Sequence, residues 1–254
     1  MDVRATLRRD GYAHLEGVLS TGACDEFAAA IRVQQKRLPN MAHGDAVWDI
    51  RCLPEVRGVF ESLWGEEDLI VGFDGVGLRE GGEECYGLPW HVDQDSSHED
   101  VACCYQSLIA IKESSAATGT ICVLPASHRH HRSLASRLDD EPGGWEFLEI
   151  PDDDVLFRQC LPPHCPLLRK GDMLLWDSRT AHMVCPPLDA VTERMVVYVC
   201  MTPRRFADEE TLRLRRHAYA NGIATTHWPH RFVDRGEAWG DAQCLGNAER
   251  VRLV

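Results

Sequence analysis

Hydrophobic spacing divides the chain near residue 69. In the first part, apolar residues recur every three or four positions between Cys24 and Ile31. This spacing predicts a helix over about 20–38, which begins at a Ser–Thr pair able to cap it. A second apolar stripe of the same kind predicts another helix over 54–65.

Beyond that point the pattern changes to short apolar runs with turn residues between them, which is typical of β-strands. The predicted strands are residues 69–73, 76–80, 88–93, 104–112, 119–124, 165–169, 172–176, 181–185 and 194–201. Residues 5–18 predict a short helix or turn and then an extended segment, and residues 208–219 predict a late helix. Helices followed by many short strands favour an α+β fold built on an antiparallel jelly roll.

No repeat or linker divides the chain, so we expect one domain over residues 1–254. Its expected parts are a helical region at about 1–68, a jelly-roll core at about 69–205, and a C-terminal helix and tail over 206–254. A polar insert at about 133–163 interrupts the core. An insert of this length is either a lid over a pocket or a surface elaboration.

The residues that suggest chemistry lie on two of the predicted strands. His91 and Asp93 are two positions apart, so both side chains point to the same side of an extended strand. His182 follows the apolar run Met173–Trp176 and can complete the set from a second strand. Two imidazoles and one carboxylate are the ligand set of mononuclear non-heme iron(II) oxygenases, in which the remaining metal positions stay open. A 2-oxo acid and O₂ can occupy those positions.

Arg194 is the second chemical signal. It enters the apolar strand that begins twelve positions after His182 (194 − 182). A buried charge without a partner is costly, and the two-pronged guanidinium suits a carboxylate. The distal carboxylate of 2-oxoglutarate would be such a partner. The alternative is an arginine at a strand end that reaches water or an acidic neighbour.

Composition narrows the class of protein. The net charge is 27 − 40 = −13, which disfavours binding to nucleic acids or to anionic membranes. The eleven cysteines are scattered and form no CxxC motif, a usage that favours reduced thiols over a disulfide framework. The N-terminus shows no signal region and no segment has the length of a transmembrane helix, so we expect a cytoplasmic protein.

Taken together, several segments resemble the phytanoyl-CoA dioxygenase (PhyH-like) family of iron(II)/2-oxoglutarate oxygenases. They are Arg9–Leu15, Leu88–Gln94, Gln106–Ile111, Thr118–His128, Trp176–His182 and the strand that begins at Arg194. The resemblance covers nearly the whole length. The segments Tyr198–Arg204 and Thr225–His230 resemble a branch of the family with fungal and algal members.

The resemblance implies a double-stranded β-helix (cupin-like) core that holds Fe(II) at His91, Asp93 and His182 and 2-oxoglutarate at Arg194. With O₂, the expected reaction is hydroxylation of an unactivated C–H bond of a small molecule, with release of succinate and CO₂. Asp93 favours hydroxylation over halogenation, because halogenating relatives carry a small residue at that position. The family varies in substrate, so neither an acyl-CoA substrate nor the choice among hydroxylation, desaturation and demethylation follows.

Other polar residues leave two interpretations open. Gln106 either contacts substrate or cosubstrate or satisfies a buried polar neighbour. Arg179 either contacts substrate or forms a salt bridge with Asp177 or Asp172. The cluster His128–Arg132 could meet an anionic substrate or a second metal, and the spaced pair His227 and His230 is interpreted as structural packing of the C-terminal part.

Two rival functions remain at this stage. One is a cupin-type metal-dependent hydrolase or isomerase that uses no 2-oxo acid, and Arg194 distinguishes it from the oxygenase. The other is a jelly roll that binds or regulates without catalysis, against which the intact ligand set argues. The sequence predicts neither the substrate nor the oligomeric state.

Overall fold

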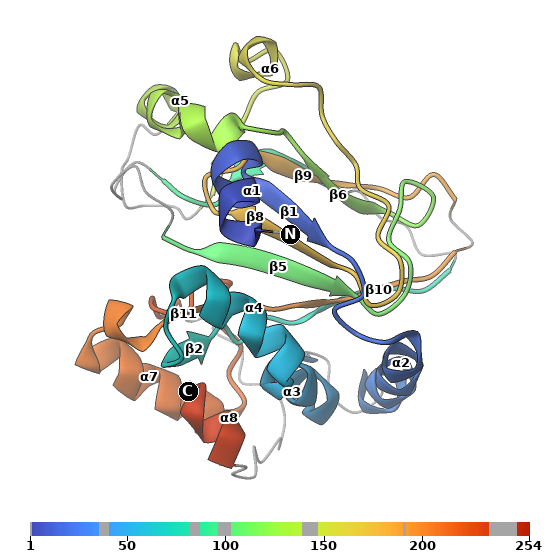
Figure 1. The fold of residues 1–254 in the computed structure, drawn as a ribbon, viewed down its shortest axis with the longest axis vertical. Coiled ribbons are helices and arrows are strands. Elements are labelled where there is room, and N and C mark those ends of the chain that lie inside the picture. The colour runs from blue at the N-terminus through green and yellow to red at the C-terminus, as the bar shows by residue number, and fades with distance from the viewer. Residues whose placement is uncertain are drawn as a thin grey trace.

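The computed structural model describes residues 2–35, 41–81, 87–95, 103–138, 147–189, 192–233 and 248–254. Helices predominate in the first part of the chain, antiparallel strands follow, and two helices lie near its end (Figure 1). The α-helices are α1 (Val3–Asp10), α2 (Thr21–Gln35), α3 (Asp45–Cys52), α4 (Pro54–Trp64), α5 (His131–Leu138), α6 (Leu156–Gln159), α7 (Glu209–Asn221) and α8 (Ala248–Arg252). Short 3₁₀ turns are η1 (Met41–His43), η2 (Ser127–His130) and η3 (Arg204–Phe206).

The strands are β1 (Tyr12–Leu15), β2 (Leu69–Val71), β3 (Val76–Arg79), β4 (Leu88–Val92), β5 (Tyr105–Ala110), β6 (Thr120–Val123), β7 (Leu148–Glu149), β8 (Met173–Asp177), β9 (His182–Cys185), β10 (Arg194–Tyr198) and β11 (Met201–Pro203). One antiparallel sheet has the order β1-β8-β5-β10-β3, and a second has the order β6-β9-β4-β7. Strand β11 pairs with β2 separately.

The inner faces of the two sheets pack against each other. Leu108, Leu174 and Val196 of the larger sheet join Ile121 and Val123 of the smaller sheet in one buried cluster. Because side chains alternate along a strand, every second residue of β5, β8, β9 and β10 faces this interior. A residue's position in the alternation therefore decides whether it can reach a site between the sheets.

Helices cover the outer faces. Buried residues of α2, α3, α4 and α7 share one cluster with the outward residues of β5, β8 and β10, and these helices lie together on one side in Figure 1. Residues of α5 and α6 pack on the outer face of the smaller sheet. The combination of helices with antiparallel sheets confirms the predicted α+β character.

Helix ends follow the local sequence. The Asp2 side chain accepts a hydrogen bond from the Ala5 backbone N–H at the start of α1, and Asp208 caps α7 in the same way. Glycines with positive φ end both helices, Gly11 with φ 81° and Gly222 with φ 66°. Glycine adopts this left-handed conformation without the Cβ penalty of other residues, so these positions stop the helices.

Most predicted strands are present with bounds shifted by one or two residues, but the predicted strand 165–169 is wrong. That segment makes only isolated bridges, Ser114 to Leu168 and, just before it, Val123 to His164. Pro166 within the segment, and Pro162 and Pro163 just before it, lack the backbone N–H that a continuous ladder requires. The predicted strand 194–201 is divided, since β10 ends at Tyr198 and β11 begins at Met201.

The predicted insert at 133–163 is less irregular than expected. It holds most of α5, the short strand β7 and α6, while residues 139–146 lie outside the described part of the chain. The helix α3 was not predicted separately. Among the described helices, none combines the length and the apolar character that crossing a bilayer demands.

Candidate metal centre

The structure brings His91, Asp93 and His182 together between the two sheets. His91 on β4 pairs in register with His182 on β9, and Asp93 follows β4 directly. Ligand atoms of the three side chains lie within 4.8 Å of one another. All three residues are buried, with exposures of 4%, 6% and 3%. The predicted ligand set is therefore a single cluster, which we call the triad.

Backbone carbonyls fix the orientation of both imidazoles. The Nδ1 of His91 lies 2.7 Å from the Pro89 carbonyl, and the Nδ1 of His182 lies 2.9 Å from the Thr180 carbonyl. A carbonyl only accepts, so each Nδ1 carries the proton and each Nε2 presents a lone pair. His91 also stacks on Phe147 with ring centroids 4.3 Å apart.

The Nε2 atoms converge on Asp93. His182 Nε2 lies 3.2 Å from Asp93 Oδ2, and His91 Nε2 lies 3.8 Å from Asp93 Oδ1. An ionised carboxylate and the free lone pair of an imidazole are both acceptors, so a cation is needed among them. The arrangement fits a metal ion, because both histidines offer a lone pair and the carboxylate offsets part of the metal charge.

The electrostatic environment keeps Asp93 charged and His91 neutral. Burial by itself raises the pKa of Asp93, but the neighbouring imidazoles, His227 foremost and then His182, outweigh burial and hold that pKa well below its usual range. Burial, assisted by the nearby His182, lowers the pKa of His91 to about 4. These are the protonation states in which carboxylate and imidazole bind metals.

Gln106 is placed against Asp93. Its side-chain amide donates a hydrogen bond of 2.5 Å to Asp93 Oδ2, and both groups are buried. Of its two predicted roles, the structure shows the contact with a buried polar neighbour. The Asp93 backbone N–H donates to the Ser178 carbonyl at 3.2 Å. The carboxylate is thus held from the side chain and from the backbone.

Arg194 also faces the interior, because it lies two positions before the inward residue Val196 of β10. It is 8% exposed, and its Nε donates to the Ser114 hydroxyl at 3.2 Å. Within the described part of the chain, its Nη2 has no hydrogen-bond partner. A side chain at Gly77 would collide with it, since a Cβ there would lie 2.9 Å from Arg194 Nη1. The buried guanidinium thus has unused donors and space beside it.

A third histidine approaches the triad from the C-terminal part of the chain. His227 interacts electrostatically with Asp93 and with His91, and its carbonyl accepts from the Cys104 thiol at 3.4 Å. Its Nε2 is buried and has no hydrogen-bond partner among the described residues. The sequence interpretation gave it a packing role only. His227 and His230 have HxxH spacing, but no local pattern in the sequence relates His227 to Asp93, which lies 134 positions earlier (227 − 93).

The other residues singled out in the sequence have local partners. Arg179 forms an ion pair with Asp177, at 2.8 Å between Nη2 and Oδ2, as one of the two interpretations stated. His128 Nε2 lies 3.1 Å from the Arg8 carbonyl, and His131 Nε2 lies 2.6 Å from the Gln94 carbonyl. Residues 96–102, which belong to the loop expected to line the pocket, lie outside the described part of the chain.

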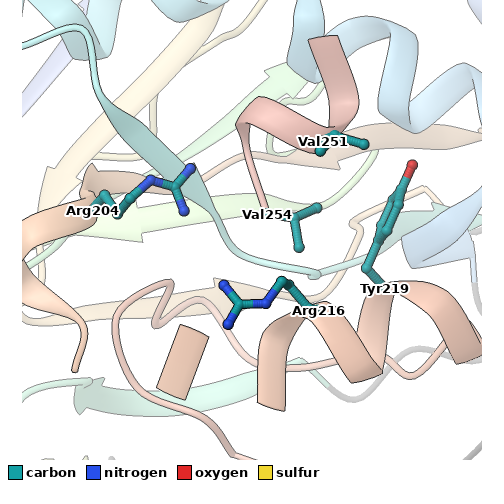
Figure 2. A pocket seen from close by; sticks show the side chains of 5 residues that line it. All are labelled: Arg204, Arg216, Tyr219, Val251 and Val254. Atoms are coloured by element: carbon teal, nitrogen blue, oxygen red, sulfur yellow. The ribbon is translucent and has the colours of Figure 1, made fainter. Parts of the chain in front are cut away.

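A separate pocket of about 310 Å³ lies beside the C-terminal helices. Its lining residues are Arg204, Arg216, Tyr219, Val251 and Val254 (Figure 2). Arg204 is already engaged with Asp68 and with the Arg252 carbonyl. None of these residues lies on the strands that carry the triad, so this pocket is distinct from the metal centre.

Comparison with known proteins supports the resemblance predicted from the sequence. The sequence model of the phytanoyl-CoA dioxygenase (PhyH) family matches residues 77–184, a region that contains the whole triad. This match confirms the predicted resemblance over that region. The Ava biosynthesis cluster protein O of Aspergillus versicolor is 27% identical over 204 residues. The alignment covers 76% of this chain and 66% of the relative.

Solved structures share the fold. The epimerase SnoN, in complex with Fe3+, alpha ketoglutarate and nogalamycin RO, superposes with a TM-score of 0.62 and 19% identity, over 79% of this chain and 82% of SnoN. A hypothetical protein of Escherichia coli, JW0805, superposes with a TM-score of 0.73 and 16% identity, over 98% of this chain and 80% of its own. At these identities the similarity establishes the fold alone.

Proposed function

We propose that this protein is a mononuclear non-heme iron(II) enzyme that uses 2-oxoglutarate and O₂ to oxidise a small molecule, with hydroxylation of an unactivated C–H bond as its reaction. The observation that carries the proposal is the triad of His91, Asp93 and His182, buried and convergent. Two imidazoles and one carboxylate are the donor set that iron(II) takes in this class of enzyme while keeping open positions.

The chain's own residues have distinct tasks at such a centre. His91, Asp93 and His182 would hold iron, and Gln106 would orient Asp93 through its hydrogen bond. Iron and 2-oxoglutarate, when bound, supply an oxidant of C–H bonds by the oxidative decarboxylation that yields succinate and CO₂. The burial of the triad keeps bulk water from the reacting groups.

Arg194 would bind the distal carboxylate of 2-oxoglutarate. Its buried Nη2 has no hydrogen-bond partner among the residues that the structure describes, and a buried cation of this kind is stabilised by an anion. Ser114 orients the guanidinium through Nε, and the missing side chain of Gly77 leaves space beside it. This contact is what separates the oxygenase from a cupin-type hydrolase or isomerase without a 2-oxo acid.

We further assign the two sheets to a double-stranded β-helix and the chain to one domain. The order β8-β5-β10-β3 in one sheet and β7-β4-β9-β6 in the other supports this assignment, because successive strands from β3 onward mostly alternate between the sheets. One buried cluster that includes both Leu7 and Val254 supports the single domain. The acidic net charge favours a small-molecule substrate over nucleic acid.

The test is an anaerobic addition of Fe(II) and 2-oxoglutarate to metal-free protein, followed by the visible charge-transfer band of a chelated 2-oxo acid. We expect the band in the natural protein and its loss in Asp93→Asn. Arg194→Lys should weaken 2-oxoglutarate binding by roughly 10- to 100-fold, since hydrogen bonds between charged groups contribute about 1.5–3 kcal/mol. Arg213→Ala, at an exposed ion pair on α7, is the matched control and should bind normally.

Each other outcome favours a rival. Iron binding without the band would favour the cupin-type hydrolase or isomerase, and absence of iron binding would favour a non-catalytic binding module. Where the band forms, the next step is a substrate screen that measures succinate release. Mass spectrometry then identifies the product. A product with one added oxygen supports hydroxylation. An isomer of unchanged mass would instead favour epimerisation, the activity for which SnoN is named.

A further inference from the structure

Three cysteine thiols lie together away from the triad. They are Cys122 on β6, Cys185 at the end of β9 and Cys165 in the segment between α6 and β8. Their sulfur atoms lie within 4.8 Å of one another, and the Cys165 and Cys185 sulfurs are 3.9 Å apart. We call this group the thiol cluster.

Strand pairing explains the position of the thiol cluster. Cys122 pairs with Met183 and Thr120 pairs with Cys185, so the two cysteines are diagonal neighbours on the same face of the sheet. The intervening residues Ile121 and Val184 face the interior, which leaves the cysteines on the outer face. Cys165 joins them because His164, its neighbour, bridges to Val123 through two backbone hydrogen bonds of 2.9 and 2.8 Å.

The spacing of the sulfurs suits a shared ion better than a disulfide. Three sulfurs that bind one ion at about 2.3 Å in tetrahedral geometry lie about 3.8 Å from one another. The observed separation of Cys165 and Cys185 is 3.9 Å, whereas a disulfide bond needs about 2.05 Å. The cluster can therefore close around a metal with little movement.

The donor set is soft. Within the described residues, the grouping contains three sulfurs and no histidine or carboxylate ligand. Thiolates select thiophilic ions such as Cu(I) and Zn(II), while the triad offers nitrogen and oxygen. Cys122 is buried and Cys165 is exposed, so one side of the cluster is open to solvent for entry of the ion or for a water ligand.

We propose that Cys122, Cys165 and Cys185 form a second metal site, which binds one thiophilic ion, Cu(I) or Zn(II), through three thiolates. The ion would tie β6, β9 and the segment before β8 together on the outer face of the strands. Cys185 lies three positions after His182 on β9 (185 − 182), so the bound ion would also anchor the strand that carries one triad ligand.

The ionisation of the thiols gives the site a pH dependence. Burial raises the pKa of Cys185 to about 11 and holds the pKa of Cys122 higher still. The metal-free thiols of Cys122 and Cys185 are then protonated near neutral pH, and each of the two must release its proton as the ion binds. Binding should therefore tighten as pH rises. The same protonation makes these thiols slow toward oxidants, which react with thiolates.

The experiment uses the reduced, metal-free full chain under anaerobic conditions, titrated with Cu(I) against a chromophoric Cu(I) chelator. A parallel titration uses Zn(II) and a zinc-responsive dye. The natural protein should retain one equivalent of ion in competition with the chelator or dye. Cys165→Ser and Cys185→Ser should bind that ion at least roughly tenfold more weakly. Cys160→Ser is the matched control, since Cys160 packs on the same outer face outside the cluster.

Cys200→Ser tests a second source of thiolates, because Cys200 interacts with Cys104 elsewhere in the fold. Retention of either ion by the natural protein, Cys160→Ser and Cys200→Ser, with loss in Cys165→Ser and Cys185→Ser, supports the site. Equal retention in Cys165→Ser and Cys185→Ser, loss in Cys200→Ser alone, or no retention of either ion would contradict it. The charge-transfer band from Fe(II) and 2-oxoglutarate is also measured in Cys165→Ser. A band like that of the natural protein shows that the variant is folded, so that lost retention of Cu(I) or Zn(II) reports on the thiol cluster and not on the triad.

Discussion

The two triad histidines are oriented by the same local device. Each Nδ1 donates to the carbonyl two positions earlier in the chain, Pro89 for His91 and Thr180 for His182. The contact is within the same short segment, so strand geometry sets both the tautomer and the ring direction. No side chain from elsewhere is needed, which is why His-x-Asp and a distant histidine carry so much information in the sequence alone.

Gln106 differs, because its partner lies on another strand. Replacing Gln106 with Leu removes the donor from Asp93 Oδ2 while keeping a similar volume. We expect iron(II) affinity to fall roughly 10- to 100-fold, the usual cost of removing a group that hydrogen-bonds a metal ligand. The measurement is an anaerobic titration with Fe(II), and the band of the 2-oxoglutarate complex should also change position.

A structural defect alone would lower stability and leave the band where it is. Gln159→Leu, at an exposed position on α6, is the control and should bind iron like the natural protein. Unchanged affinity and an unchanged band in Gln106→Leu would show that Gln106 does not position Asp93.

At the scale of single residues, the triad could be predicted from the sequence. His91 and Asp93 come from one predicted strand, and His182 follows the recognisable apolar run Met173–Trp176. The contacts of Gln106 with Asp93 and of Ser114 with Arg194 could not be predicted, because they join residues 13 and 80 positions apart. The approach of His227 depends on how the C-terminal segment returns to the sheets. Pairings of this kind are set by topology and register, which alternation alone does not determine.

Turns decide where the helices and strands meet. The backbone at Gly171, in the turn before β8, has little freedom to change. It has φ +88°, and a Cβ there would lie 2.0 Å from the Leu19 carbonyl oxygen. Gly171→Ala should therefore lower the free energy of unfolding by at least about 2 kcal/mol, through left-handed strain and a backbone collision. Urea denaturation of the metal-free protein measures it.

Gly58 provides the opposite case. It lies within α4 with no atom near its missing Cβ, so Gly58→Ala should stabilise by about 0.5–1 kcal/mol through helix propensity. If Gly171→Ala were as stable as the natural protein, the contact between Leu19, before α2, and Gly171, before β8, would have to be looser than the structure shows.

The elements themselves were predicted unevenly. Strands with clear alternation or continuous apolar character were found. The segment 165–169, which contains Pro166, was mistaken for a strand because its leucines are apolar. Helix α3 was missed because its sequence, Asp45–Cys52, mixes buried residues such as Trp48 and Arg51 without a clean polar face. A helix buried on several sides lacks the one-sided stripe on which the prediction depends.

At the scale of the whole molecule, the helical layer is assembled from both ends of the chain. Arg215 on α7 donates to the carbonyls of Val71, Pro229, Leu253 and Val254, and it is fully buried. Burial lowers the pKa of Arg215 to about 9, yet the carbonyls satisfy its donors. This single side chain links β2, the segment after α7 and the C-terminus, a convergence that no local pattern predicts.

His43 lies at the centre of the same layer and makes its stability sensitive to acid. Its Nε2–H donates to the Ile223 carbonyl at 2.8 Å, and its Nδ1 accepts from the Trp48 indole N–H at 3.4 Å. The bond from Trp48 requires the neutral ring, because a protonated Nδ1 cannot accept. Burial, with the nearby positive charges of Arg51 and Arg215, lowers the pKa of His43 from 6.5 to about 4. Protonation thus opposes folding.

The sign of the pH effect follows from this depressed pKa. Between about pH 6.5 and pH 4 the unfolded chain binds a proton at His43 that the folded chain does not, so stability rises with pH through this window. The contribution is complete above pH 6.5. As pH falls this contribution to stability is lost, by about 3 kcal/mol in all at about 1.4 kcal/mol per pKa unit.

His43→Gln keeps a donor and cannot titrate, so urea unfolding of this variant should depend less steeply on pH in that window. Other acid-sensitive groups affect both proteins alike, so parallel curves for the two would mean that folding does not lower the pKa of His43.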